Sequence, residues 1–220
     1  MTEGTPMFIS VEGSEGSGKS TNVAMLRDFL LEQNIPVLEL REPGGTAVGE
    51  EIRHLLKRVD LSPALCNESE LLLFLASRAQ VVREKILPAL KNGVTVLCDR
   101  YFDSTIAYQG GAREISLETI RCINRFAIGN CVPDLTFLLD LPPARGFSRI
   151  YTQRGTTPDR VEMEKLAFFE RVRSTYQDIA REEPRRFHTI SADAPLDQVQ
   201  NEMRRVVLER IGKCVHSHWR

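Results

Sequence analysis

The sequence lacks the features that mark membrane-spanning, disulfide-bonded and metal-centred proteins. No apolar run approaches the ~20 residues that a membrane-spanning helix needs. The five cysteines share no ligand-like spacing and the four histidines are scattered, so we expect reduced thiols and no structural metal. The first six residues are polar and acidic, and we expect no signal peptide and a cytoplasmic location.

The chain also lacks an excess of charge of either sign. It has 29 lysines and arginines against 30 aspartates and glutamates, a formal net charge of −1. Nucleic-acid binders usually carry a strong positive field, so we expect neither a nucleic-acid nor a membrane partner. No repeat, low-complexity tract or flexible linker divides the 220 residues, so we expect a single domain over 1–220.

Short apolar runs alternate with helical patterns, which predicts an α/β fold with a parallel sheet covered by helices on both faces. Five strands are expected, at residues 7–11, 37–40, 94–98, 135–141 and 187–191. Helices are expected at residues 21–33, 48–58, 69–90 and about 162–181, and in a last amphipathic segment that includes 199–211. The basic, breaker-rich segment at about 145–162 is expected to form a mobile lid.

The most informative stretch is GSEGSGKS at residues 13–20, which fits the phosphate-binding pattern G-x-x-x-x-G-K-[ST]. It lies between a predicted strand and a predicted helix, where loop N–H groups and the helix N-terminus attract an anion. Lys19 would reach the outer phosphates of a nucleoside triphosphate, and the Ser20 hydroxyl would bind Mg²⁺. The expected phosphate contacts are Gly13, Ser14, Glu15, Gly16, Ser17, Gly18, Lys19, Ser20 and Thr21.

Charged residues follow two of the predicted strands. Asp99 comes at a strand end where folds of this type place a carboxylate near Mg²⁺, directly or through water. Triphosphate-hydrolysing motors usually carry a glutamate at the next position, where it orients a water molecule. This chain has Arg100 there, and an arginine favours the binding of a second anionic substrate. Because parallel strands end at the same crevice, Arg41 and Arg100 are expected near the phosphate loop, where their planar guanidinium groups suit phosphate.

Several motifs together resemble the bacterial thymidylate kinases. They are REPGGT at 41–46, DRY at 99–101 and AYQG at 107–110, and YQDIA at 176–180 resembles the usual end of the helix after the lid. The resemblance covers about 8–180. It implies the P-loop nucleoside monophosphate kinase fold, phosphorylation of dTMP to dTDP by ATP with Mg²⁺ in dTTP synthesis, and a homodimer formed through helices that include 69–90.

The resemblance also implies the contacts of the acceptor nucleotide. Phe74 would stack on the thymine ring, and Arg78, one turn later on the same helix face, would hydrogen-bond the base edge. Tyr108 would close off the sugar 2′ position and so favour deoxyribose. The other implied contacts are Ser104, Thr105 and Gln109 beside the base, Glu12 at the sugar 3′-hydroxyl and the phosphates, and Arg41 and Arg100 at the monophosphate.

Thymidylate kinases of one class carry a catalytic arginine in the phosphate loop, and those of the other class carry it in the lid. The loop here has Glu15 and no arginine, so it resembles the second class. Arg154 is then the candidate for transition-state contact, with Arg149 and Arg160 as alternates, since residues 155–162 are one residue longer than the family's G-x-x-D-R-[IV]-E. The implied catalytic residues are Lys19, Arg154, Arg100 and Glu12.

Two other functions stay open at this point. Another nucleoside or nucleotide kinase would differ in base choice, which Phe74, Arg78 and Tyr108 would decide. A triphosphate-hydrolysing switch is more remote, because a guanine-binding switch ordinarily needs Asn-Lys-x-Asp and no asparagine here is followed by lysine.

Overall fold

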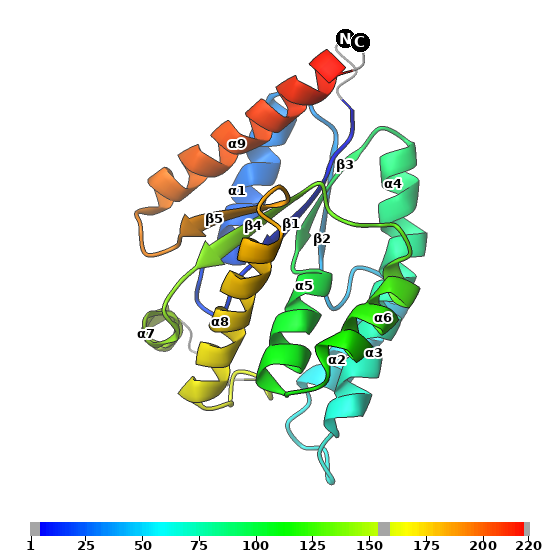
Figure 1. Cartoon of the computed structure of the whole chain (residues 1–220), viewed down its shortest axis with the longest axis vertical. Coiled ribbons are helices and arrows are strands. Elements are labelled where there is room, and N and C mark those ends of the chain that lie inside the picture. Colours follow the sequence, from blue (N-terminus) through cyan, green and yellow to red (C-terminus); the bar gives the residue numbers. More distant parts are fainter. Residues whose placement is uncertain (1–4, 154–158, 218–220) are drawn as a thin grey trace.

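The computed structural model describes residues 5–153 and 159–217. Its parallel strands form one sheet in the order β2-β3-β1-β4-β5 (Figure 1), which confirms the predicted five-stranded parallel α/β fold. The strands are β1 (Phe8–Glu12), β2 (Val37–Arg41), β3 (Thr95–Asp99), β4 (Leu135–Asp140) and β5 (Phe187–Ser191). β1 is central and buried at every residue, as expected for a strand covered on both faces.

Helices lie on both faces of the sheet. They are α1 (Lys19–Glu32), α2 (Ala47–Lys57), α3 (Asn67–Val81), the π-helical η1 (Val82–Ile86), α4 (Leu87–Lys91), α5 (Phe102–Thr105), the π-helical η2 (Ile106–Ala112), α6 (Leu117–Ile128), α7 (Pro143–Gln153), α8 (Leu166–Glu182) and α9 (Leu196–Ser217). In the part of the chain that the structure describes, no helix has the length and apolar character needed to cross a membrane.

Neighbouring residues of β1 point into separate hydrophobic clusters. Ile9 packs with Leu26 of α1 and Met203 of α9 on one face of the sheet. Phe8 packs with Leu75 of α3 on the other face, together with side chains from η2, α6 and α8. Each buried aliphatic or aromatic side chain contributes ~1.5–3 kcal/mol, so both clusters fix the sheet and the loops at its carboxyl end.

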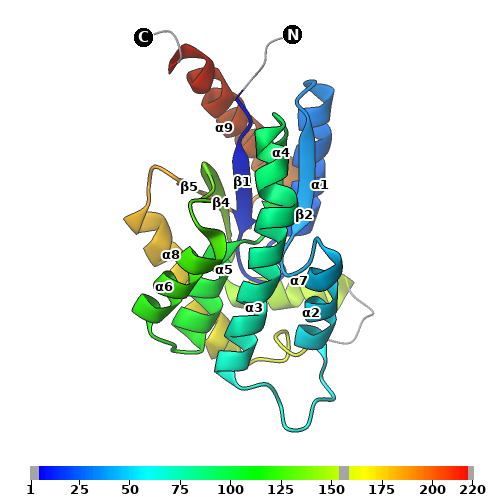
Figure 2. The same cartoon turned by 90° about the vertical axis from the view of Figure 1, so that its right-hand side faces the viewer.

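The helix predicted over 69–90 extends over α3, η1 and α4, as one column in Figure 2. Its α-helical hydrogen bonding is interrupted in η1, where the N–H of Leu87 bonds the carbonyl of Val82, five residues back. Pro88 lacks an N–H and would clash with the carbonyl four residues before it, and the wider π turn accommodates it. Asn92 and Gly93 end the helix as predicted, with Gly93 at φ 75°.

The segment predicted as a lid is partly helical. α7 takes up the residues to Gln153, because Pro143 stands at the start of the helix, where a missing N–H costs nothing. Residues 154–158, with Arg154, lie outside the described residues. Turns follow over 159–164, here called the return limb, and α8 begins at Leu166 rather than near 162. The helices α5, η2 and α6 were not predicted.

Candidate active site

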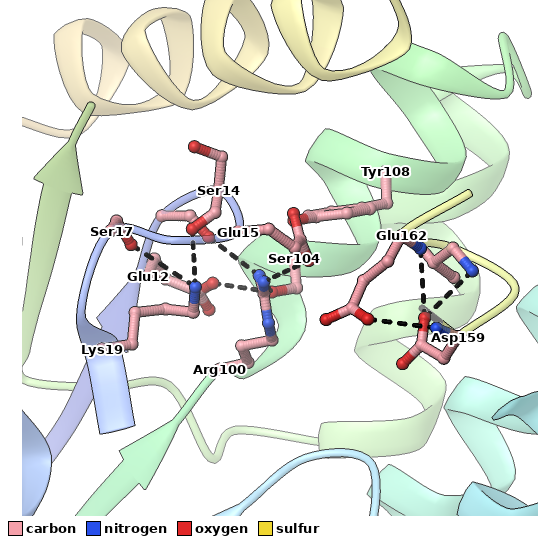
Figure 3. Close-up of polar contacts among 12 residues, drawn as sticks. Glu12, Ser14, Glu15, Ser17, Lys19, Arg100, Ser104, Tyr108, Asp159 and Glu162 are labelled. Atoms are coloured by element: carbon pink, nitrogen blue, oxygen red, sulfur yellow. Dashed lines mark hydrogen bonds and ion pairs between the residues drawn. The ribbon is translucent and has the colours of Figure 1, made fainter. Parts of the chain in front are cut away.

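The loop over 13–20 joins β1 to α1 and curls around the side chain of Lys19. The Lys19 Nζ donates to the carbonyl oxygen of Ser14 at 2.8 Å and lies 3.4 Å from the Ser17 hydroxyl (Figure 3). A Cβ at Gly13 would lie 2.5 Å from the carbonyl oxygen of Leu139, so the loop can pack this closely on β4 only with glycine there. Burial, with the charge of Arg100, lowers the pKa of Lys19 to about 8, and an anion beside Nζ would favour its charged form.

Ser20 and Asp99 meet at the start of α1, as the sequence predicts for a metal site. The Ser20 hydroxyl donates to Asp99 Oδ2 at 2.6 Å, although the two residues are far apart in the chain. Both line the same cavity as Lys19. A hydroxyl and a carboxylate are hard oxygen ligands, and Mg²⁺ commonly takes one or two such protein ligands together with water and phosphate. The pair therefore fits Mg²⁺.

Arg100 connects the phosphate loop to the opposite wall. Its φ of 70° is unusual for a residue other than glycine and turns the chain sharply after Asp99. The guanidinium donates to the Gly13 carbonyl at 3.0 Å and to the Glu15 carboxylate at 2.7 Å. The Tyr108 hydroxyl also donates to Glu15, at 2.6 Å (Figure 3). Glu15, Arg100 and Tyr108 thus form a polar cluster at the end of the loop.

A cavity of about 580 Å³ opens between this loop, α2, α3, η2 and the return limb, a size typical of small-molecule sites. It brings together most of the predicted site residues. Those in its wall are Glu15, Gly16, Gly18, Lys19, Ser20, Thr21, Arg41, Phe74, Asp99, Arg100, Ser104, Thr105, Tyr108, Gln109 and Arg149. The π-helical η2 carries Tyr108 and Gln109 into the wall, in keeping with the frequent use of π turns at functional sites.

Glu12 lies beneath the cavity rather than in its wall. The side chain is 0% exposed, and its carboxylate accepts from the Tyr101 N–H and the hydroxyls of Ser104 and Tyr176, each at 2.7 Å. Burial and the nearby charge of Asp103 raise the pKa of Glu12 to about 7. Glu12 thus holds Ser104 and Tyr176 in place. Its contact with the sugar 3′-hydroxyl, which the resemblance implied, stays a prediction.

Arg78 lies behind the wall. It is 1% exposed and pairs with Glu42 at 2.7 Å, while its Nη1 donates to Thr105 at 2.6 Å and to Asn124 at 3.0 Å. Its contact with a base edge stays a prediction. Removing Arg78 would leave the Glu42 carboxylate buried without its cation. Such a substitution would therefore destabilise the fold in addition to any effect on ligand binding.

Several wall residues were missed in the sequence. Arg53 and Lys57 of α2 line the cavity, and Lys57 pairs at 3.1 Å with Asp159 of the return limb. Asp159 and Glu162 also line it and bond each other across the limb (Figure 3), the Asp159 N–H donating to Glu162 at 3.0 Å. On a helix such as 48–58, cations are ordinary surface residues, so no pattern distinguishes Arg53 and Lys57 before the helix is placed.

The candidate lid arginines differ in position. Arg149 of α7 lines the cavity and donates to the Gly16 carbonyl at 3.4 Å. α7 approaches the loop closely at this point, because a Cβ on Gly146 would lie 2.3 Å from the Glu15 carbonyl oxygen. Arg160 instead pairs with Glu70 of α3 at 2.6 Å. Arg154 lies outside the described residues, so the choice among Arg149, Arg154 and Arg160 stays a prediction.

A phosphate loop and several arginines that line one cavity suit transfer of a phosphoryl group between two bound substrates. The sequence profile of the family described as Thymidylate kinase matches residues 11–203. The chain belongs to the thymidylate kinase family. It is therefore an enzyme of the kinase class, a nucleotide-binding transferase.

Individual thymidylate kinases match over nearly their whole length. The protein from Desulfosudis oleivorans is 45% identical over 213 residues, which cover 93% of this chain and 97% of that protein. The protein from Kosmotoga olearia is 41% identical over 211 residues, covering 96% and 100% respectively. The crystal structure of thymidylate kinase from Ehrlichia chaffeensis superposes with a TM-score of 0.74 at 35% identity, covering 92% of this chain and 98% of that one. Both sequence and fold thus support the family.

Proposed function

We propose that this member of the thymidylate kinase family transfers the γ-phosphoryl group of ATP to dTMP, giving ADP and dTDP, with Mg²⁺ as cofactor. The observation that carries the proposal is a cavity lined by Lys19, by the Ser20–Asp99 pair and by Arg41 and Arg100. Phe74 lines the same cavity at a position suited to a base. The site therefore offers places for a donor triphosphate and an acceptor monophosphate.

In the proposed reaction an oxygen of the dTMP phosphate attacks the γ-phosphorus, and the bond from that phosphorus to the bridging oxygen breaks to leave ADP. Lys19 neutralises charge on the outer phosphates, and Arg100, with Arg41, holds the acceptor phosphate in line. Arg149 or Arg154 supplies further positive charge from the lid segment. Ser20 and Asp99 would hold Mg²⁺, which supplies charge neutralisation at the phosphates when bound.

The cluster of Glu15 and Tyr108 suits the sugar of the acceptor. The Glu15 carboxylate lines the cavity, whereas Glu12 is buried below it, so we assign the sugar 3′-hydroxyl to Glu15 rather than to Glu12. Tyr108 is held beside Glu15 by its hydroxyl and blocks space at the 2′ position. We also retain as proposals a single kinase domain over 1–220 with a lid at about 145–162, a cytoplasmic location and a homodimer.

An acceptor panel tests the proposed reaction. Initial rates with ATP and Mg²⁺ are measured for dTMP, dUMP, dCMP and dGMP, and we expect dTMP to have the highest kcat/KM. Asp99→Asn should lower kcat on the order of a hundredfold or more, whereas the matched change Asp178→Asn, at an exposed position of α8, should not. A higher kcat/KM for another acceptor would make the chain a kinase of different base choice. ATP hydrolysis that dTMP leaves unaffected would indicate a switch.

A further inference from the structure

Glu70 is a buried carboxylate that the proposed reaction does not use. It lies in the first turn of α3 with its side chain 2% exposed. Its oxygens accept from Gln109 at 2.7 Å, contact Arg113 at 3.3 Å through both Nε and Nη2, and pair with Arg160 at 2.6 Å. Burial alone would raise the pKa of Glu70, but the hydrogen bond from Gln109 and the charges of Arg113 and Arg160 hold it below the ordinary value. Glu70 is therefore an ionised junction.

The junction joins the base-side wall to the return limb, which are also linked by the ion pair of Arg113 with Glu164. Gln109 comes from η2 and lines the wall beside Phe74, which lies one helical turn after Glu70 on the same side of α3. Arg160 belongs to the return limb. Gln109 donates a hydrogen bond to Glu70 and Arg160 forms an ion pair with it, and among the described residues no hydrogen bond or ion pair joins Gln109 to Arg160 directly.

The return limb is fixed at further points, so its position depends on a small set of polar contacts. The Arg160 Nε donates to the Leu56 carbonyl of α2 at 3.1 Å, and Lys57 pairs with Asp159 at 3.1 Å. Arg113 joins the limb to η2 by an ion pair with Glu164. Because Asp159 and Glu162 line the cavity, any shift of the limb changes the wall. If the Glu70 charge is lost, the positive charges of Arg113 and Arg160 are no longer fully compensated, and their contacts at this point weaken.

We propose that Glu70 is a positioning residue that couples the base-side wall, through Gln109, to the return limb, through Arg160. The proposal rests on the proposed function only for the choice of acceptor. As a consequence, the acceptor pocket and the return limb move together. A change in either of them weakens binding of the acceptor. Donor binding at the phosphate loop lies on the far side of the cavity and depends on Lys19 and Ser20 instead.

Steady-state kinetics of Glu70→Gln test the first consequence. This substitution keeps the shape and removes the charge, and we expect the KM for dTMP to rise on the order of tenfold while the KM for ATP stays within about twofold. Glu68→Gln, an exposed glutamate in the same turn, is the matched control and should leave both constants unchanged. Thermal midpoints verify that each variant is folded at the assay temperature. A dTMP KM equal to that of the parent chain overturns the proposal.

A mutant cycle separates coupling from a merely structural role. Gln109→Ala and Arg160→Met are combined with and without Glu70→Gln, and kcat/KM for dTMP is measured in each. We expect the effects of the Gln109 and Arg160 changes to be non-additive with Glu70 present and additive in the Glu70→Gln background. Additivity in both backgrounds overturns the coupling. If the parent chain prefers another nucleoside monophosphate, the proposed function fails and the same cycle run with that acceptor still decides the role of Glu70.

Discussion

Glu12 shows how the fold can change the chemistry of a single side chain. Folding raises its pKa from 4.5 to about 7, first because of burial and then because of Asp103. The folded chain therefore holds a proton in a range of pH where the unfolded chain has released it. The stability that this gives is fully present below pH 4.5 and is lost as the pH rises through about 7.

The sign of this effect gives a prediction for Glu12→Gln, which keeps a neutral group in place. Between pH 5 and pH 8 the thermal midpoint of the parent chain should fall relative to that of the variant by several degrees. One pKa unit is worth ~1.4 kcal/mol, and each kcal/mol shifts the midpoint by ~2–4 °C in a chain of this length. Calorimetry at matched ionic strength measures the difference. A gap that is constant over this range, or equal to that for the exposed Glu32→Gln, would contradict it.

Lys19, Ser20, Asp99 and Arg100 were predictable because each is adjacent in the sequence to a recognisable loop or strand end. Their mutual contacts follow once the strands are parallel and ordered. Glu70 was not predictable, because a glutamate in the first turn of a helix normally interacts with the helix N-terminus and solvent. Only the packing of η2 and the return limb against α3 makes it a buried junction.

At the scale of elements, α7 shows that a helix can form where the sequence is rich in breaker residues. Pro143 fits the first turn of the helix, and Gly146 allows the helix to touch the phosphate loop. The strands and the long helix had clearer signals, because their apolar residues repeat with the period of the element. Helices α5 and η2 include glycines and polar wall residues that weaken such a period.

We predict that Gly146→Ala lowers kcat by about tenfold or more, because the added Cβ would displace α7 and with it Arg149 from the loop. The matched control is Gly212→Ala in α9, an exposed position where a Cβ meets nothing within 4 Å. Single-turnover phosphoryl transfer at saturating ATP and dTMP measures the effect. An unchanged rate in Gly146→Ala would show that the close contact of α7 with the loop is not needed for transfer.

At the scale of the whole molecule, exposed apolar side chains on α3 and α6 favour the proposed homodimer. Phe126 is 85% exposed and Leu72 is 61% exposed, which is costly for large apolar groups. We predict that Phe126→Glu and Leu72→Glu each shift the chain from dimer to monomer in sedimentation velocity, at micromolar concentration. Leu208→Glu on α9, where the leucine is 44% exposed, serves as the control and should not. A monomeric parent chain, or equal dissociation by the control, would count against this interface.

The sharp turn at Arg100 has a consequence for how two substrates are spaced. Asp99 bonds Ser20, which would hold Mg²⁺ in the proposed reaction, while its neighbour Arg100, which would hold the acceptor phosphate, reaches Gly13 and Glu15 of the phosphate loop. Consecutive Cα atoms are ~3.8 Å apart whatever else moves. In the proposed reaction, the residue that would hold Mg²⁺ and the residue that would hold the acceptor phosphate are therefore separated by a single peptide bond, and their backbone spacing stays constant when helices around the cavity shift.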